Sequence, residues 1–220
     1  MQKQFNKLIG ILLLSVSLLF SVNVHSDQAL SDTENVNKYK LLILGDSLSA
    51  AYGLTEPEGW VYLLSERWKQ EQAPIEVINA AISGDTTDGG LARLPRLLSL
   101  HKPTHLYIEL GGNNGLQGHN PNKIKENLAQ KIALAQEQDV QVILQEIQIP
   151  TNYGRRYSEM FTNNYQQLAD EYAVPLIPFF LQDIALKPEL MQNDGIHPVA
   201  EAQPMIVDFI KPKFEAIILP

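Results

Sequence analysis

The residue types best suited to catalysis form four short groups that lie far apart in the chain. In sequence order the groups are residues 45–48 (Gly-Asp-Ser-Leu), Gly84, residues 112–114 (Gly-Asn-Asn) and residues 194–197 (Asp-Gly-Ile-His). A serine hydroxyl becomes a strong nucleophile when an imidazole accepts its proton, and a carboxylate on the other ring nitrogen fixes the imidazole tautomer. The first and last groups therefore predict an acyl-transfer site in which Ser47 attacks, His197 is the base and Asp194 holds the base.

The two middle groups are suited to stabilising negative charge. When a hydroxyl attacks an ester carbonyl, the carbonyl oxygen becomes an oxyanion, and each donor already in place lowers the barrier by about 3 to 4 kcal/mol. The candidate donors are the backbone N–H groups of Ser47 and Gly84 and the side-chain amide of Asn113. Taken singly, Gly84 is more typical of an ordinary turn and Asn113 of a loop residue that caps its neighbours. The prediction of an oxyanion hole therefore depends on finding all three donors together with the catalytic serine and histidine.

From residue 39 onward, short apolar runs alternate with helical patterns. The apolar runs that predict buried strands are 40–44, 76–79, 105–110, 140–145 and 175–177. The segments whose spacing predicts helices are 60–69, 121–138, 158–172 and 199–214. Because a helical crossover is the usual connection between parallel strands, this alternation predicts a three-layer α/β/α fold with a parallel sheet.

Three of the four groups follow closely after predicted strands. In open α/β sheets, ligands bind outside the carboxyl ends of the strands, so Ser47, Gly84 and Asn113 are expected at one edge of the sheet. A Gly-Asp-Ser tripeptide by itself is also found in ordinary strand-to-helix turns. The prediction of one shared site comes from the groups together.

The first 26 residues have the pattern of a secretory signal peptide, with two lysines, an apolar stretch and small residues before the expected cleavage point. An uncleaved membrane anchor is the alternative, because about 15 apolar residues approach the shortest spanning length. Residues 27–38 are polar and acidic and predict a flexible N-terminal segment, and residues 39–220 are expected to form one domain. The chain has no cysteine, so disulfides and thiolate metal ligands are excluded, and we expect a periplasmic or secreted bacterial protein.

Charge and composition narrow the classes of partner. The chain has 17 basic and 25 acidic side chains, a net charge of −8, which repels nucleic acid and anionic membrane surfaces. His101, His105 and His119 lack the spacing of metal ligands and are predicted to be structural or solvated. We therefore expect a small-molecule substrate, no nucleic acid, no membrane span after signal cleavage, no metal or other cofactor, and a monomer.

With these groups in this order, the chain resembles the GDSL or SGNH hydrolase superfamily, which is named for its Ser, Gly, Asn and His blocks. Within it, the chain is most similar to the bacterial periplasmic thioesterase I/lysophospholipase group of multifunctional arylesterases. The further segments that carry this similarity are 51–54, 59–60, 79–80, 150–157, 195–198, which overlaps the fourth group, and 202–204. The similarity extends over nearly all of the chain after the signal peptide.

The resemblance implies a flavodoxin-like sheet of five parallel strands and a serine hydrolase without cofactor. It assigns Ser47, Asp194 and His197 as the catalytic triad and Ser47, Gly84 and Asn113 as the oxyanion hole. The substrates that it implies are acyl esters and thioesters, including aryl esters, lysophospholipids and long-chain acyl-CoA, with release of the free fatty acid.

Two residues beside the predicted catalytic groups need separate interpretation. The third block of the resembling group usually ends in Asp, whereas this chain has Asn114, which keeps hydrogen bonding but brings no negative charge. We expect altered loop behaviour or pH response with the chemistry intact. Asp46 lies next to the nucleophile, and orientation of the site is a better interpretation of it than direct catalysis.

The segments after the third and fourth predicted strands contain residues that could line a groove for an acyl chain, namely Leu116, Ile149, Tyr153 and Met160. Core packing explains these four nearly as well. Arg155 and Arg156 could meet an anionic headgroup or a coenzyme phosphate, although solvated charges or a loop-fixing ion pair are the more ordinary interpretation.

Two other functions remain open at this point. One is a carbohydrate acetyl esterase of the same superfamily, which would use identical catalytic residues on acetylated sugars. The other is a lipid-binding protein that kept the fold and lost catalysis, against which the presence of every expected catalytic residue argues.

Overall fold

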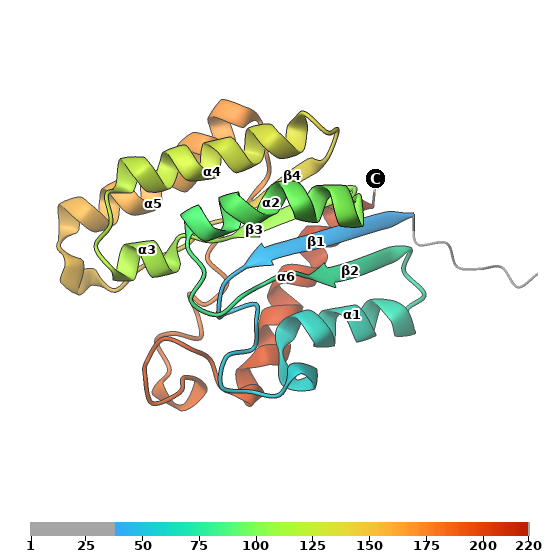
Figure 1. The fold of residues 1–220 in the computed structure, drawn as a ribbon. Coiled ribbons are helices and arrows are strands. Elements are labelled where there is room, and N and C mark those ends of the chain that lie inside the picture. The colour runs from blue at the N-terminus through green and yellow to red at the C-terminus, as the bar shows by residue number, and fades with distance from the viewer. Residues whose placement is uncertain (1–37, 220) are drawn as a thin grey trace, which may run out of the picture. The chain divides into compact units, whose positions relative to one another are not determined.

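The apolar runs form five parallel strands in the computed structural model, which describes residues 38–219 (Figure 1). The strands are β1 Tyr39–Gly45, β2 Ile75–Asn79, β3 His105–Glu109, β4 Gln141–Gln145 and β5 Leu176–Ile177. They lie in the order β2-β1-β3-β4-β5. The predicted parallel α/β sheet is confirmed. The predicted signal peptide (1–26) and all but the last residue of the predicted N-terminal segment (27–38) lie outside the described residues.

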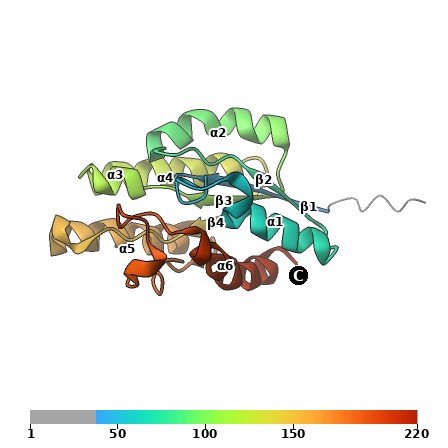
Figure 2. The same cartoon turned by 90° about the horizontal axis from the view of Figure 1, so that it is seen from below.

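Helices cover both faces of this sheet. The helices are α1 Trp60–Gln70, α2 Thr87–His101, α3 Gly112–Leu116, α4 Pro121–Gln136, α5 Arg155–Tyr172 and α6 Gln203–Ile218. The buried residues of α2, α4 and α5 form one core cluster with the sheet, and those of α1 and α6 form another. Figure 2 shows α1 and α6 side by side on their face. Among residues 38–219, none of the helices has both the length and the apolar character that a membrane crossing requires.

Strand β1 shows why the sheet is apolar on both sides. Leu41 and Ile43 pack in the cluster of α1 and α6, whereas Leu42 and Leu44 pack in the cluster of α2, α4 and α5. All four side chains are fully buried. A continuous apolar run of this kind is typical of a parallel strand that is covered on both faces, and it fixes the end of β1, where the first catalytic group begins.

Helix α2 is absent from the helices that the sequence predicts. Its segment contains Gly89, Gly90 and Pro95, all of which disfavour a helix interior. Tertiary packing overrides this preference: Leu94 and Leu98 are buried in the core, and a Cβ at position 90 would overlap the side chain of Leu110. The side chain of Thr86 caps the helix by accepting a hydrogen bond from the N–H of Gly89.

The predicted helices differ from the observed ones mainly at their ends. Helix α5 begins at Arg155 rather than at residue 158, and α4 ends at Gln136 rather than at residue 138. The segment predicted as a helix from residue 199 begins with the 3-10 turn Ala200–Ala202 and continues as α6. These shifts reflect turns and fraying ends that apolar spacing does not encode.

Candidate active site

A tight turn directly after β1 carries Ser47. The carboxylate of Asp46 accepts a hydrogen bond from the N–H of Leu48 (3.1 Å), and the carbonyl of Asp46 accepts one from the N–H of Ala50 (3.0 Å). A side chain that bonds its own backbone two residues ahead is the usual way in which Asp fixes a turn. Ser47 is therefore held half-buried at the carboxyl end of the sheet, where the sequence placed it.

The last group of catalytic residues reaches Ser47 from a loop that precedes α6. Nε2 of His197 lies 2.8 Å from Oγ of Ser47, and Nδ1 of His197 lies 2.6 Å from Oδ2 of Asp194. The other carboxylate oxygen, Oδ1, accepts hydrogen bonds from the N–H groups of Ile196 (2.9 Å) and His197 (3.0 Å). Hydroxyl, imidazole and carboxylate thus form one continuous chain of hydrogen bonds.

The surroundings of Asp194 keep it ionised. Burial raises the pKa of its carboxyl, but the hydrogen bonds from the ring of His197 and from the N–H groups of Ile196 and His197 outweigh burial and lower the pKa to about 2. An ionised carboxylate on Nδ1 favours the tautomer in which Nδ1 carries the proton and Nε2 is free to accept one from Ser47.

Asn113 joins the turn of Ser47 to the loop of Gly84. Its Nδ2 donates to the carbonyl of Asp85 (2.9 Å) and to Oδ2 of Asp46 (3.3 Å). Gly84 is exposed with a φ of 80°, a backbone conformation that favours glycine, and a Cβ placed there would meet nothing within 4 Å. Asn113, at the start of α3, is therefore bonded both to the turn that carries Ser47 and to the loop that carries Gly84.

Arg93 fixes the loop of Gly84 and was missed by the sequence analysis. Its Nε and Nη2 lie 2.9 Å and 2.7 Å from Oδ2 of Asp85, and its guanidinium also bonds the carbonyls of Ala80 and Gly45. A guanidinium that bonds several acceptors at once holds a loop more firmly than a single point contact. Arg93 lies on α2, so the failure to predict that helix also hid this contact.

Tyr52 was also missed. Its ring packs against the ring of His197 with 4.4 Å between the centroids and an angle of 37°. Gln192 Nε2 donates to the carbonyl of Tyr52 (2.8 Å), which connects the turn after β1 to the loop of His197. The similarity of segment 51–54 to known hydrolases was the available signal, but nothing in the sequence placed this ring beside the imidazole.

Asn114 is buried behind the site. Its Oδ1 accepts a hydrogen bond from the N–H of Thr87 (2.8 Å), and its Nδ2 lies 3.0 Å from Nδ1 of His119 and 3.5 Å from a carboxylate oxygen of Asp88. The side chain therefore connects α3, which carries Asn113, to the first turn of α2. A neutral amide suits this place because it donates to Asp88, whereas a second carboxylate would be repelled by it.

We predict that Asn114→Asp leaves activity at pH 8 within about threefold and lowers the free energy of unfolding at that pH by about 1 to 3 kcal/mol. The new carboxylate would be buried, would face the carboxylate of Asp88 and would have no proton to donate to it. Urea unfolding at pH 8 measures the difference, and an unchanged free energy of unfolding would contradict the prediction.

Of the four residues predicted for an acyl groove, three lie in α3 or beside it. Ile149 is buried and packs against Gly115, and the hydroxyl of Tyr153 donates to the carbonyl of Leu116 (2.6 Å). Met160 is exposed and, with Tyr153, lines a cavity of about 540 Å³ at the start of α5 that Arg155 and Arg156 also border. The structure therefore places Leu116, Ile149 and Tyr153 close to the helix of Asn113 and Met160 farther along α5.

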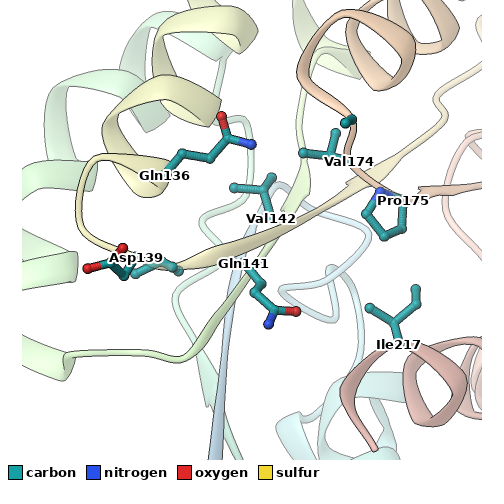
Figure 3. A pocket seen from close by; sticks show the side chains of 9 residues that line it. Gln136, Asp139, Gln141, Val142, Val174, Pro175 and Ile217 are labelled. Carbon is teal, nitrogen blue, oxygen red and sulfur yellow. The ribbon is translucent and has the colours of Figure 1, made fainter. Parts of the chain in front are cut away.

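A second cavity has a volume of about 380 Å³. Figure 3 shows the side chains that line it. Its lining includes the first residues of β4, the segment before β5 and Ile217 near the end of α6. These residues belong to the amino ends of the strands. Since ligands of parallel sheets bind at the carboxyl ends, this cavity is not the candidate active site.

A serine hydroxyl bonded to an imidazole whose other nitrogen bonds a carboxylate is the arrangement that defines a serine hydrolase, and here it lies at the carboxyl end of a parallel sheet. The chain belongs to the GDSL-like lipase/acylhydrolase family, whose model matches residues 43–203. The predicted membership is confirmed, and the protein is an ester hydrolase.

Three relatives illustrate the similarity. The chain is 46% identical over 178 residues to thioesterase 1/protease 1/lysophospholipase L1 of Escherichia coli strain K12, covering 81% of this chain and 84% of that protein. It is 47% identical over 171 residues to an arylesterase of Vibrio mimicus, covering 78% and 86%. The structure of the psychrotrophic esterase EstA from Pseudoalteromonas sp., inhibited by monoethylphosphonate, matches with a TM-score of 0.81 and 46% identity over 83% of this chain and all of that one.

Proposed function

We propose that the protein hydrolyses acyl esters and thioesters through a covalent acyl-enzyme on Ser47. The observation that carries this proposal is the continuous hydrogen-bond chain in which Nε2 of His197 lies 2.8 Å from Oγ of Ser47 and Nδ1 lies 2.6 Å from Asp194. A hydroxyl with a base at this distance and a carboxylate behind the base can attack a carbonyl carbon.

The reaction has two halves. His197 takes the proton of Ser47 while Oγ attacks the carbonyl carbon, and the N–H groups of Ser47 and Gly84 and the amide of Asn113 stabilise the oxyanion. His197 then protonates the leaving alcohol or thiol. In the second half it activates water, which releases the free fatty acid from Ser47.

Asn113 must change one hydrogen bond during this cycle. Both of its amide protons are engaged, at 2.9 Å from the carbonyl of Asp85 and at 3.3 Å from Asp46. The longer bond is the weaker one and is the one that a substrate oxyanion would share. The bond to Asp46 orients the amide before the oxyanion forms, and the shorter bond to Asp85 persists while the oxyanion is bound.

The substrate class rests on the relatives and on the apolar residues near α3. The relatives are named for thioester, lysophospholipid and aryl ester hydrolysis, and the EstA structure is that of an esterase inhibited by a phosphonate. Leu116 and Tyr153, which are partly exposed and lie over the buried Ile149, offer apolar surface near Asn113 for an acyl chain. We therefore infer aryl esters, lysophospholipids and long-chain acyl-CoA as substrates.

Labelling and a chain-length series test this function together. A fluorophosphonate probe should label the purified protein, and p-nitrophenyl esters from acetate to palmitate should show hydrolysis beyond the acetyl ester. Strict preference for acetyl esters and acetylated sugars would instead support a carbohydrate acetyl esterase. Binding of fatty acid without labelling would support a carrier and overturn the proposal.

We predict that Asn113→Ala lowers kcat by about 10² to 10³-fold, because one oxyanion donor is lost. Hydrolysis of p-nitrophenyl butyrate measures the effect, and Asn163→Ala, an exposed amide on α5, is the matched control. A normal kcat in Asn113→Ala would remove this residue from the oxyanion hole while leaving the role of Ser47 untouched.

We also infer that residues 1–26 direct export to the bacterial periplasm or medium and that the protein acts as a monomer. The basis is the signal pattern of the first residues and the acidic charge of the chain. Cell fractionation with N-terminal sequencing, and light scattering of the purified protein, test these two points. A retained N-terminus in the membrane fraction would support the anchor instead.

A further inference from the structure

A buried glutamate lies directly beneath the turn that carries Ser47. Glu109 ends β3 beside Gly45 of β1, and its side chain is fully buried. Its Oε2 accepts hydrogen bonds from the N–H of Asp46 (3.2 Å) and the hydroxyl of Ser49 (2.8 Å). A Cβ at position 45 would come within 2.7 Å of Oε2, so glycine is needed there to make room for the carboxyl group.

These contacts continue to the candidate oxyanion hole. Glu109 bonds the backbone of Asp46, and the carboxylate of Asp46 accepts from the N–H of Leu48 and from Nδ2 of Asn113. One buried side chain therefore bonds both sides of the Ser47 turn and, through a single intermediate, contacts the amide of Asn113. The proposed mechanism makes no use of Glu109.

The chemistry of Glu109 is that of a neutral acid. Burial raises its pKa well above the ordinary value, and the neighbouring charge of Asp46 raises it further. For Asp46, burial likewise raises the pKa, to about 6, although bonds from Leu48 and Glu109 oppose the rise. Oε1 of Glu109 is buried and meets no donor among the described residues. The side-chain hydrogen bond between the two carboxyl groups lowers the pKa of Asp46 and raises that of Glu109, so the proton in this bond belongs to Glu109 and is donated to Asp46.

The other titratable groups around the pair do not change this assignment. Burial and the charges of the two acids raise the pKa values of the Tyr107 and Tyr165 hydroxyls, so both hydroxyls remain neutral. Asp85 raises and His197 lowers the pKa of Asp46. Among residues 38–219, the ion pairs do not include a cation on Glu109. A fully buried carboxylate without a cation is costly, whereas a carboxylic acid is not.

We propose that Glu109 is a positioning residue for the ester hydrolysis: its carboxylic acid holds the turn of Ser47 and orients the carboxylate of Asp46, which in turn fixes the amide of Asn113. This role rests on the proposed function of Asn113 as an oxyanion donor. It accounts for a polar side chain in the core beneath the nucleophile, where an apolar residue would pack without requiring hydrogen-bond partners.

Two substitutions of Glu109 separate positioning from simple packing. Glu109→Gln keeps an acceptor for Asp46 N–H and Ser49 and a donor for the carboxylate of Asp46, so kcat should stay within about threefold. Glu109→Leu removes both and should lower kcat for p-nitrophenyl butyrate by about 10 to 100-fold with little change in KM. Glu137→Leu, at an exposed position after α4, is the matched control.

A double-mutant cycle tests whether Glu109 acts through Asn113. If it does, Glu109→Leu should cost less than about threefold in an Asn113→Ala background, because the group that it positions is already absent. An equal loss in both backgrounds, an unchanged kcat in Glu109→Leu, or a Glu109→Gln variant as slow as Glu109→Leu would overturn the proposal.

Asp46→Asn provides a second route should Glu109→Leu fail to fold. The carboxylate of Asp46 has two oxygens that accept hydrogen bonds from Leu48, Asn113 and Glu109. An asparagine side chain has only one acceptor oxygen and cannot keep all three bonds, so kcat should fall by about tenfold or more. This loss should again shrink in the Asn113→Ala background, and full additivity would overturn the proposal. Fluorophosphonate labelling of the natural protein checks the proposed function separately. If the natural protein is not labelled, the proposed function is wrong. If it is labelled and the effects of the two substitutions on kcat are additive, only the proposed role of Glu109 is wrong.

Discussion

Ser47→Ala should lower kcat for ester hydrolysis by about 10⁵-fold or more, the largest effect expected of any single substitution in this protein. The hydroxyl that forms the acyl-enzyme is lost, and no other serine hydroxyl is bonded to the ring of His197 among the described residues. The remaining rate would come from the oxyanion donors acting on bound substrate and water. Single-turnover hydrolysis of p-nitrophenyl butyrate, with fluorophosphonate labelling in parallel, measures the loss.

The fold should survive this substitution. Ser47 is half-buried and loses one hydrogen bond, which costs about 1 kcal/mol of stability. Ser99→Ala, on an exposed position of α2, is the matched control and should change neither turnover nor labelling. Unchanged turnover in pure Ser47→Ala protein would refute the proposed nucleophile.

The parallel sheet could be predicted from the sequence because its signals are local. Residues 41–44 are apolar without interruption, which indicates a strand that is buried on both faces. The expectation that Ser47, Gly84 and Asn113 share one edge needed only the parallel direction of the strands. Helix α2 could not be predicted in this way, because Gly90 and Pro95 disfavour a helix locally and the contacts that stabilise it come from distant residues.

The residues that support the site could not be predicted either, because their contacts come from distant parts of the chain. Glu109 is one charged residue at the end of an apolar run, and its contact with Asp46 spans 63 residues. Tyr52 likewise contacts His197 across a long sequence separation, and Arg93 bonds the carbonyl of Gly45, which is 48 residues away. Catalytic residues form recognisable sequence blocks, whereas the side chains that hold them are defined only by the folded structure.

Asp194→Asn is expected to lower kcat by about 10⁴-fold with the loop largely unchanged. The amide oxygen can still accept from the N–H groups of Ile196 and His197, so the turn keeps its bonds. The amide nitrogen, however, donates toward Nδ1 of His197 and favours the tautomer in which Nε2 carries the proton. A protonated Nε2 cannot accept the proton of Ser47, and the loss should therefore appear in kcat rather than in KM.

The same variant should remove a pH-dependent part of the stability. The folded-state pKa of Asp194, about 2, lies below its ordinary value of 3.8, so its carboxylate stabilises the fold above about pH 4 and this contribution disappears as the pH falls toward 2. The difference in unfolding free energy between the natural protein and Asp194→Asn should therefore shrink from pH 5 to pH 2.5, as measured by urea unfolding. Asp183→Asn, which removes an exposed carboxylate elsewhere in the chain, is the matched control. A kcat within tenfold of the natural enzyme would contradict the role proposed for Asp194.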